Sequence, residues 1–423
     1  MIADAYRGLS LVATPLIPAY LRYRARHGKE DPSRLAERLG MPTRPRPEGR
    51  LAWVHAASVG ETLSVLPLIE RMLQDYRGLN VMLTSGTVTS ARMMHARLPD
   101  GAFHQFAPVD TPSAVAGFLE HWRPDAAIWV ESEFWPNLVA DTRRRGIPMA
   151  LVNARMSERS YRNWRRLPSV IADLLSSFQV CVAQSPGDAG RLGSLGARDV
   201  SCHGNLKDSA PPLNADPREL YELNRQIGRR PFWLAASTHP GEERLVAKTH
   251  TRVRQQLPDL LTIIVPRHPQ RGEEVREEIA MPGLQVARRA RGEPLQTDTQ
   301  IYLADTLGEL GLFYRAAPLV FVGGSLVPHG GQNPLEAARL DCALLLGPHT
   351  FNFVEQTARL TAVGGARTVA DADALTESVE ALLQTPAEMA RMAKAAAGVA
   401  DSGREALDAV LANLRPLLNG RAA

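Results

Sequence analysis

The sequence contains few cysteines and none of the short motifs that mark common metal or nucleotide sites. Cys181, Cys202 and Cys342 are isolated within short apolar runs, and no two of them form a C-x-x-C pair. An odd, scattered set is typical of buried thiols in a reducing compartment, which argues against a disulfide framework or a zinc-thiolate site. The chain also lacks H-E-x-x-H, a P-loop and internal repeats, which excludes zincin proteases, P-loop NTPases and repeat arrays.

The chain has almost no excess of one charge beyond its first fifty residues. In total, 49 Lys and Arg stand against 45 Asp and Glu, for a net charge of +4. Residues 1–50 hold ten basic and five acidic side chains, a net charge of +5, so the rest of the chain is close to neutral. Nucleic-acid-binding proteins use a broad basic footprint, which this body lacks. The composition therefore argues against a nucleic-acid partner and leaves the basic N-terminus to a local explanation.

The apolar run at the N-terminus is short for a membrane span. Residues 8–20 would extend about 20 Å as a helix, against a hydrocarbon core of about 30 Å, and Pro15 and Pro18 would kink it. The basic residues at 22–26 follow the apolar run, whereas in a signal peptide the charges come first. We expect residues 1–25 to form a membrane-anchor segment that dips into the bilayer with its basic flank on the cytoplasmic face. The alternative is an N-terminal helix packed on the body of the protein.

Short apolar runs alternate with helical stretches from residue 51 onward, which is the pattern of β-α-β units around parallel sheets. The predicted strands are 51–55, 80–84, 126–130, 147–152 and 178–183, followed by 232–236, 261–265, 301–304, 319–322 and 343–346. A stretch rich in Pro, Asn and Asp at 205–217 is the best candidate linker, and the tail 372–419 is predicted to be helical. We predict an α/β fold with two Rossmann-like domains, 26–205 and 218–423, whose strand ends face a shared ligand cleft.

Charged side chains follow several predicted strands in the first half. Glu61 ends the turn 55–61 and opens a helix, where a carboxylate is either a general base or a favourable first-turn acid. A helix start favours the ionised form, which would make Glu61 a weaker base. Glu131 and Glu133 come directly after a buried strand. Lys207 lies at the predicted linker, where it either reaches the cleft or is a solvated hinge lysine.

Polar and glycine-rich turns follow predicted strands in the second half. Residues 237–243 have the form of a capping box, and Arg267 follows a strand, where its guanidinium suits a phosphate. The stretch 323–336 contains two glycine pairs and places Glu336 on the first turn of the next helix, able to accept from a ribose hydroxyl. The D-x-D pair at 371–373 precedes a helix, which favours N-capping over metal binding. No other residue set predicts a metal.

The segment 143–166 is rich in arginine. Its arginines, interleaved with Tyr161 and Trp164 and opposed by the single acid Glu158, are Arg143, Arg144, Arg145, Arg155, Arg159, Arg162, Arg165 and Arg166. Such a segment is either a surface for a polyanion or lipid head groups, or a solvated helix face.

A series of ordered motifs runs over nearly the whole chain. They are WVHAASVGE (53–61), LTSGT (83–87), APVDTP (107–112), ESEFWPN (131–137), LVNARMSERS (151–160), GNLKD (204–208), ASTHPGEE (236–243), PRHPQR (266–271) and GGSLVPHGGQNPLE (323–336). Together they resemble the 3-deoxy-D-manno-octulosonic acid (Kdo) transferases of Gram-negative lipopolysaccharide synthesis. The resemblance implies a two-domain GT-B glycosyltransferase that uses no cofactor or metal. It would transfer Kdo from CMP-Kdo to a lipid A precursor, lipid IVA, at the cytoplasmic side of the cell inner membrane.

The same resemblance implies roles for individual residues. Glu61 is similar to the family's catalytic base, and Glu131 and Lys207 are similar to its transition-state stabilisers. The residues similar to its CMP contacts are Pro266, Arg267, Gly308, Glu309, Leu310, Asn333, Pro334, Leu335 and Glu336. Asp208 departs from the commoner pattern, in which an aromatic residue follows the lysine. Another GT-B enzyme with a different donor, an epimerase and a lipid-binding membrane scaffold remain as alternatives.

Overall fold

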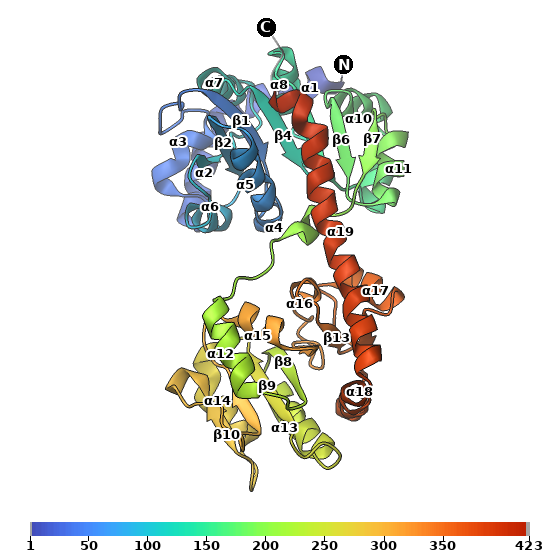
Figure 1. Ribbon diagram of the computed structural model, residues 1–423. Helices are drawn as coiled ribbons and strands as arrows, with labels where there is room; N and C mark the ends of the chain where they lie inside the picture. The colour runs from blue at the N-terminus through green and yellow to red at the C-terminus, as the bar shows by residue number, and fades with distance from the viewer. Residues whose placement is uncertain (1, 420–423) are drawn as a thin grey trace. The chain divides into compact units, whose positions relative to one another are not determined.

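The chain folds into two compact units in the computed structural model, which describes residues 2–419. Unit 1 contains the chain up to Ala210 together with the stretch from Gly403 onward, and unit 2 is Pro211–Ser402. Within the described residues, each unit has one seven-stranded sheet (Figure 1). All strand pairs in both sheets are parallel, as the alternating sequence pattern predicts.

The sheet of unit 1 has the order β3-β2-β1-β4-β5-β6-β7. Its strands are β1 (Arg50–His55), β2 (Leu79–Ser85), β3 (Ala102–Phe106), β4 (Ala126–Val130), β5 (Met149–Ala154), β6 (Val180–Ala183) and β7 (Val200–Cys202). The order reverses between β1 and β4, which pair directly although two strands separate them in sequence. Open parallel sheets bind ligands beyond the carboxyl ends of the strands at such a switch point.

The sheet of unit 2 has the order β10-β11-β9-β8-β12-β13-β14. Its strands are β8 (Phe232–Thr238), β9 (Leu261–Pro266), β10 (Val286–Arg288), β11 (Ile301–Leu303), β12 (Leu319–Val322), β13 (Ala343–Leu346) and β14 (Ala366–Thr368). Its switch point lies between β8 and β12. The two units therefore share one architecture.

Helices join the successive strands (Figure 1). Unit 1 contains α1 (Ile2–Ala13), α2 (Ile17–Arg26), α3 (Leu35–Arg38), α4 (Val59–Ser64), α5 (Leu66–Asp75), α6 (Val88–His95), α7 (Pro112–Trp122), α8 (Pro136–Arg144), α9 (Glu158–Trp164), α10 (Pro168–Leu175) and α11 (Pro186–Ser194). Unit 2 contains α12 (Pro217–Ile227), α13 (Glu242–Val253), α14 (Gly272–Ile279), α15 (Leu310–Ala316), α16 (Pro334–Ala338), α17 (Val354–Ala362) and α18 (Ala372–Gln384), while α19 (Pro386–Leu418) runs from unit 2 into unit 1. Many begin at a side-chain cap, as at Ser58, Thr87 and Asp371, which satisfies amide groups that the first turn leaves free.

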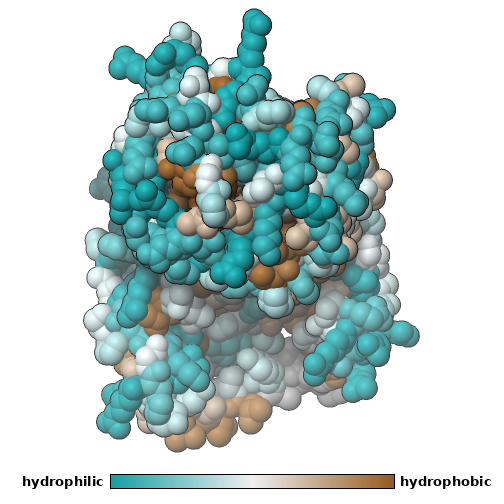
Figure 2. Space-filling view, turned by 90° about the horizontal axis from the view of Figure 1, so that it is seen from below, coloured by the Kyte–Doolittle hydropathy of each residue, from teal (hydrophilic) through white to brown (hydrophobic). Residues whose placement is uncertain are grey.

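Apolar side chains fill both faces of each sheet. On one face of unit 1, the rings of Trp53 and Trp129 lie 4.8 Å apart between centroids, on neighbouring strands, and Phe118 of α7 packs against them. The opposite face holds Val54 and Leu68 in a second cluster. The face of the molecule drawn in Figure 2 is correspondingly mostly hydrophilic, with hydrophobic residues gathered in small separate patches.

The end of α19 completes the core of unit 1. Leu407, Val410, Leu411 and Leu414 are buried in the same cluster as Val54 of β1. The predicted domain 218–423 differs from the observed division at this end, because the apolar stripe of the last helix packs on the sheet of unit 1.

The N-terminal segment forms α1, a 3-10 turn (Thr14–Leu16) and α2, so the helix breaks where the sequence predicts a kink at Pro15. Among the described helices, none combines the length and the apolar character that crossing a membrane requires. The segment is tied to unit 1, since Tyr6 donates a hydrogen bond to Asp110 at 2.9 Å and Arg7 pairs with Asp141 at 2.9 Å. Its exposed large apolar side chains include Leu9, Leu11, Val12, Leu16, Tyr20 and Tyr23.

Candidate functional site

Glu61 lies at the carboxyl end of β1, beside the switch point of unit 1, on the first turn of α4. Ser58 caps this helix by accepting from the Glu61 amide at 3.3 Å, and its hydroxyl donates to Glu61 Oε1 at 2.7 Å. The Ala57 amide donates to Glu61 Oε2 at 2.8 Å. This capping box fixes the carboxylate in one orientation and leaves Glu61 only 7% exposed.

The pKa of Glu61 is raised above its usual range, chiefly by burial. The hydrogen bonds from Ser58 and Ala57 lower the pKa, and the charges of Glu131 and Glu133 raise it further. The expectation that the helix start makes Glu61 a weaker base is therefore wrong in direction, because burial outweighs the amide contacts. A raised pKa makes the ionised carboxylate a stronger proton acceptor.

Glu131 and Lys207 form an ion pair within unit 1. Their charged atoms, Oε1 and Nζ, are 2.8 Å apart. Glu131 directly follows β4, and its backbone is left-handed, with φ of 59°, an uncommon conformation for a residue with a side chain. Such strain is kept where the surrounding structure imposes it, and it is frequent at functional sites.

Lys207 lies on a 3-10 turn (Leu206–Ser209) that two asparagines hold in place. Asn153 Oδ1, from β5, accepts from the Leu206 amide at 3.0 Å, and Asn205 Oδ1 accepts from the Lys207 amide at 3.0 Å. Asn153 is itself left-handed, with φ of 49°, a conformation that asparagine tolerates better than most residues. The carboxyl end of β5 thereby fixes the position of the lysine.

A pocket of about 550 Å³ lies in unit 2 at the carboxyl ends of its strands. Its lining residues are Leu213, Asn214, Ser237, Arg267, Gly308, Leu310, Gly311, Gln332, Asn333, Glu336 and Phe353. The structure thus brings Arg267, Gly308, Leu310, Asn333 and Glu336, all singled out in the sequence, to one cavity.

The other singled-out residues of unit 2 lie around this pocket and do not line it. Pro266 is the last residue of β9, and Pro334 and Leu335 are buried at the start of α16. Glu309 accepts from Arg289 Nε at 2.7 Å, so its carboxylate is already engaged within unit 2. Glu336 faces the pocket, and burial raises its pKa.

A buried carboxylate fixes the glycine-rich loop that leads to α16. Glu242 is fully buried and accepts four backbone hydrogen bonds, from the amides of His239 (3.0 Å), Gly324 (2.7 Å), Ser325 (3.1 Å) and Leu326 (2.9 Å). The loop also passes so close to β8 that a Cβ on Gly323 would lie 2.5 Å from the Ser237 carbonyl oxygen.

No group of three or more His, Cys, Asp or Glu side chains suited to a metal ion occurs among the described residues. Asp371 accepts from the Ala374 amide at 2.9 Å and so caps α18, as the sequence predicts for the D-x-D pair. Asp373 pairs with Arg252 on the surface.

Comparison with known proteins identifies the family. A family profile described as "3-Deoxy-D-manno-octulosonic-acid transferase (kdotransferase)" matches residues 33–210. The 3-deoxy-D-manno-octulosonic acid transferase of Haemophilus influenzae is 35% identical, over 98% of this chain and 98% of its own length. The chain belongs to the Kdo transferase family. A probable mitochondrial Kdo transferase of Arabidopsis thaliana is 34% identical over 98% of this chain and 94% of its own length. The Bordetella pertussis Kdo transferase is 36% identical, over 86% and 88%.

Solved structures share the GT-B-like fold of this Kdo transferase family member at low identity. The UDP-GlcNAc 2-epimerase of Neisseria meningitidis matches with a TM-score of 0.55 and 14% identity, covering 87% of this chain and 100% of the epimerase. A glycosyltransferase of Rickettsia africae matches with a TM-score of 0.50 and 13% identity, covering 89% and 100%. At such identities the likeness shows the fold alone.

Sequence reasoning missed two residues that shape the sites of this Kdo transferase family member. Asn153 lies within the motif at 151–160, which predicts no role for it, although a polar residue inside an otherwise apolar strand is a usable signal. The sequence around Glu242 predicts only a capping box at the start of a helix. Its contacts with residues more than eighty positions later come from the pairing of β8 with β12, which local patterns do not reveal.

Proposed function

We propose that this protein transfers Kdo from CMP-Kdo to a lipid A precursor, lipid IVA, in lipopolysaccharide biosynthesis, with Glu61 as the general base and no metal. Membership of the Kdo transferase family supports the reaction class. The observation that carries the assignment of the base is a buried carboxylate with a raised pKa, fixed at the switch point of unit 1 by Ser58 and Ala57.

In the proposed reaction, a hydroxyl of the acceptor attacks the anomeric carbon of Kdo and passes its proton to Glu61. The bond between that carbon and the phosphate oxygen breaks, and CMP leaves as a monophosphate with one more negative charge. A positioned base contributes about 10²–10⁴-fold to such a rate.

Unit 2 is the proposed donor site. A pocket of about 550 Å³ falls in the size range of small-molecule sites. Arg267 supplies a guanidinium suited to the CMP phosphate, and Glu336 supplies a carboxylate suited to the ribose hydroxyls. Pro266, Gly308, Glu309, Leu310 and the start of α16 complete the proposed contacts.

Glu131 and Lys207 are the proposed transition-state stabilisers. Lys207 carries the positive charge that opposes the charge developing on the leaving phosphate, which is the role a metal ion plays in other transferases. Its pairing with Glu131 at 2.8 Å holds the ammonium group before substrate binds. Preorganised charge of this kind needs no rearrangement at the moment of reaction.

The exposed apolar side chains of α1 and α2 support a location at the cytoplasmic face of the inner membrane. Leu9, Leu11, Val12 and Leu16 are exposed and are followed in the sequence by the basic residues of α2, a combination suited to an anionic bilayer surface. Residues 1–25 would then bring the enzyme to its lipid acceptor.

Mass spectrometry of lipid IVA after incubation with CMP-Kdo tests the donor, the acceptor and the number of sugars together. We expect a mass increase of one or more Kdo residues, lost in Glu61→Gln. A stronger response to UDP than to CMP in a nucleotide titration would favour another donor or an epimerase. Lipid binding without product would favour a membrane scaffold.

A further inference from the structure

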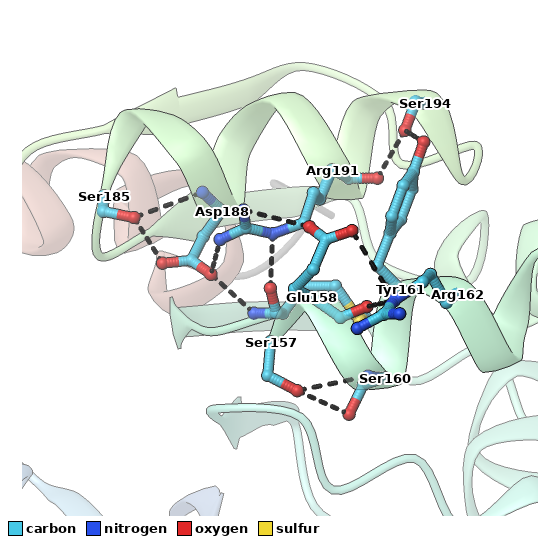
Figure 3. Close-up of polar contacts among 10 residues, drawn as sticks. Ser157, Glu158, Ser160, Tyr161, Arg162, Ser185, Asp188, Arg191 and Ser194 are labelled. Carbon is cyan, nitrogen blue, oxygen red and sulfur yellow. Dashed lines mark hydrogen bonds and ion pairs between the residues drawn. The ribbon is translucent and has the colours of Figure 1, made fainter.

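The arginine-rich segment that follows β5 is anchored to its neighbour α11 (Figure 3). The Met156 amide donates to Asp188 Oδ1 at 2.8 Å, and the Met156 carbonyl accepts from Arg191. Ser194 donates to the Tyr161 hydroxyl at 3.2 Å, so the segment is tied to α11 both before α9 and within it. These contacts fix the position of the segment relative to α11.

Its arginines are left largely without acidic partners. Glu158, the one acid among residues 155–166, is shared at long range by Arg162 (3.8 Å) and Arg191 (4.0 Å). The side chains of Arg155, Arg159 and Arg166 are exposed and make no hydrogen bond or ion pair with any residue that the structure describes. A cluster of unpaired guanidinium groups is suited to a multivalent anion, above all to phosphate, which arginine binds through two parallel hydrogen bonds.

Three of these arginines lie on one side of the helix. Arg159, Arg162 and Arg166 are spaced by three and four residues, so they share one side of α9 and the turn that follows it. Tyr161 and Trp164 lie on the other side, packed against the core of unit 1. We name the surface formed by Arg155, Arg159, Arg162 and Arg166 the arginine face.

The arginine face begins at the proposed catalytic edge of unit 1. Arg155 follows the last residue of β5 and is two positions after Asn153, whose side chain binds the amide next to Lys207. A ligand on the face would therefore lie at the same strand ends as Lys207 and Glu131.

The composition of the face favours a phosphorylated sugar over a bilayer surface. A surface that inserts into a bilayer carries exposed apolar side chains beside its cations. On α9 the aromatic side chains point inward, and Leu167, 39% exposed, is the large apolar residue beside them at the surface. The most strongly exposed large apolar side chains of unit 1 lie in the N-terminal segment, as with Val12 at 77% and Leu9 at 71%.

We propose that the arginine face binds the phosphate groups on the sugar head group of the lipid acceptor and so positions the acceptor hydroxyl for attack. The proposal rests on the proposed function, in which the acceptor is a lipid A precursor. It assigns to unit 1 a phosphate-recognition site that is separate from the Arg267 pocket of unit 2.

The test compares acceptor kinetics in detergent for the full-length chain and two triple variants. Arg159→Gln/Arg162→Gln/Arg166→Gln removes three charges from the arginine face. The matched control, Arg77→Gln/Arg97→Gln/Arg198→Gln, removes three exposed arginines of unit 1 from the connections that lead into the amino ends of β2, β3 and β7. Each protein is assayed with the bisphosphorylated precursor and with the same precursor after phosphatase treatment.

We expect the face variant to raise the KM for the bisphosphorylated acceptor by about tenfold or more, with the KM for CMP-Kdo and the unfolding midpoint unchanged. The effect should shrink to less than about twofold with the dephosphorylated acceptor, because the groups that the arginines bind are then absent. The control variant should match the wild type with both acceptors.

Three results would overturn the proposal: an unchanged acceptor KM, an equal rise in the control, or an equal rise with the dephosphorylated acceptor. Reduced binding to phosphatidylglycerol vesicles with an unchanged acceptor KM would instead assign the face to the bilayer. Absence of transfer by the wild type to either acceptor would contradict the proposed function itself, so the two failures are distinguishable.

Discussion

Unit 1 and unit 2 have the same seven-stranded architecture, yet they present their candidate residues in different ways. In unit 1 the candidates are three charged side chains, Glu61, Glu131 and Lys207, each fixed by a cap, a partner or a neighbouring strand. In unit 2 the candidates lie in several loops that follow strands, and the buried Glu242 clamps the backbone of one of them, the glycine-rich loop that leads to Asn333 and Glu336. Under the proposed function, unit 1 supplies the reactive charges and unit 2 supplies the surface that binds the donor.

The sharpest test of this division is Glu61→Gln. Glutamine is also favoured at this capping-box position, so the fold of α4 should persist while the base is lost. We expect kcat to fall by about 10²–10⁴-fold, with the KM for CMP-Kdo within about twofold of the wild type. Steady-state kinetics with both substrates would measure this, and near-normal turnover would remove Glu61 from the reaction.

Glu131 and Lys207, the ion pair of unit 1, should contribute to kcat jointly and not independently. Lys207→Met and Glu131→Gln should each lower kcat by about 10²-fold, and the double variant should lose little more than either single variant, because groups that act together are not additive. A double-mutant cycle on kcat measures the coupling. Fully additive losses would show that the 2.8 Å pair has no joint role.

Glu242→Gln, in unit 2, should change mainly a KM, whereas the variants of unit 1 change mainly kcat. A glutamine side chain has one oxygen and an NH₂ group, so it cannot accept all four backbone hydrogen bonds, and about 1–3 kcal/mol of stability is lost. We expect the KM for CMP-Kdo to rise about tenfold with a smaller change in kcat. Glu277→Gln, at an exposed position on α14, is the control. A fall in kcat alone would contradict a binding role for the loop.

The smallest expected effect concerns pH. Burial raises the pKa of Glu61 above the ordinary value of 4.5, so kcat/KM should fall with decreasing pH around a midpoint above 4.5. The folded protein holds this proton more tightly than the unfolded chain does. The wild type should therefore lose stability relative to Glu61→Gln as pH rises through the window that begins at 4.5. Kinetic and thermal-unfolding profiles of both proteins test the sign, and parallel profiles would contradict it.

Long apolar strands were the most predictable part of the fold. β1, β4, β8 and β9 lie within a residue or two of their predicted ranges, because buried parallel strands read as continuous apolar runs. The strands at the outer edges of the sheets, such as β7 with its three half-buried residues, carry no such run and were missed.

Long-range placements were harder to predict than local ones. The motifs placed Arg267 directly after a strand, and Glu61 and Glu336 on the first turns of helices, since each of these positions depends on local geometry. Asn153 accepts a hydrogen bond from the turn that carries Lys207, and Glu242 accepts hydrogen bonds from the glycine-rich loop. Both contacts depend on which strands become neighbours in the sheet. The direction of the Glu61 pKa shift likewise needed the burial of the folded state.

The return of α19 to unit 1 makes unit 2 an insertion within the chain of unit 1. During synthesis, all of unit 2 is made before Leu407, Val410 and Leu414 exist to cover the apolar face of the first sheet. A fragment that stops at residue 210 would therefore expose this face to water, whereas a shortened chain that joins residue 210 directly to residue 403 would restore the cover. The unit that begins the chain is thus the last to finish its core.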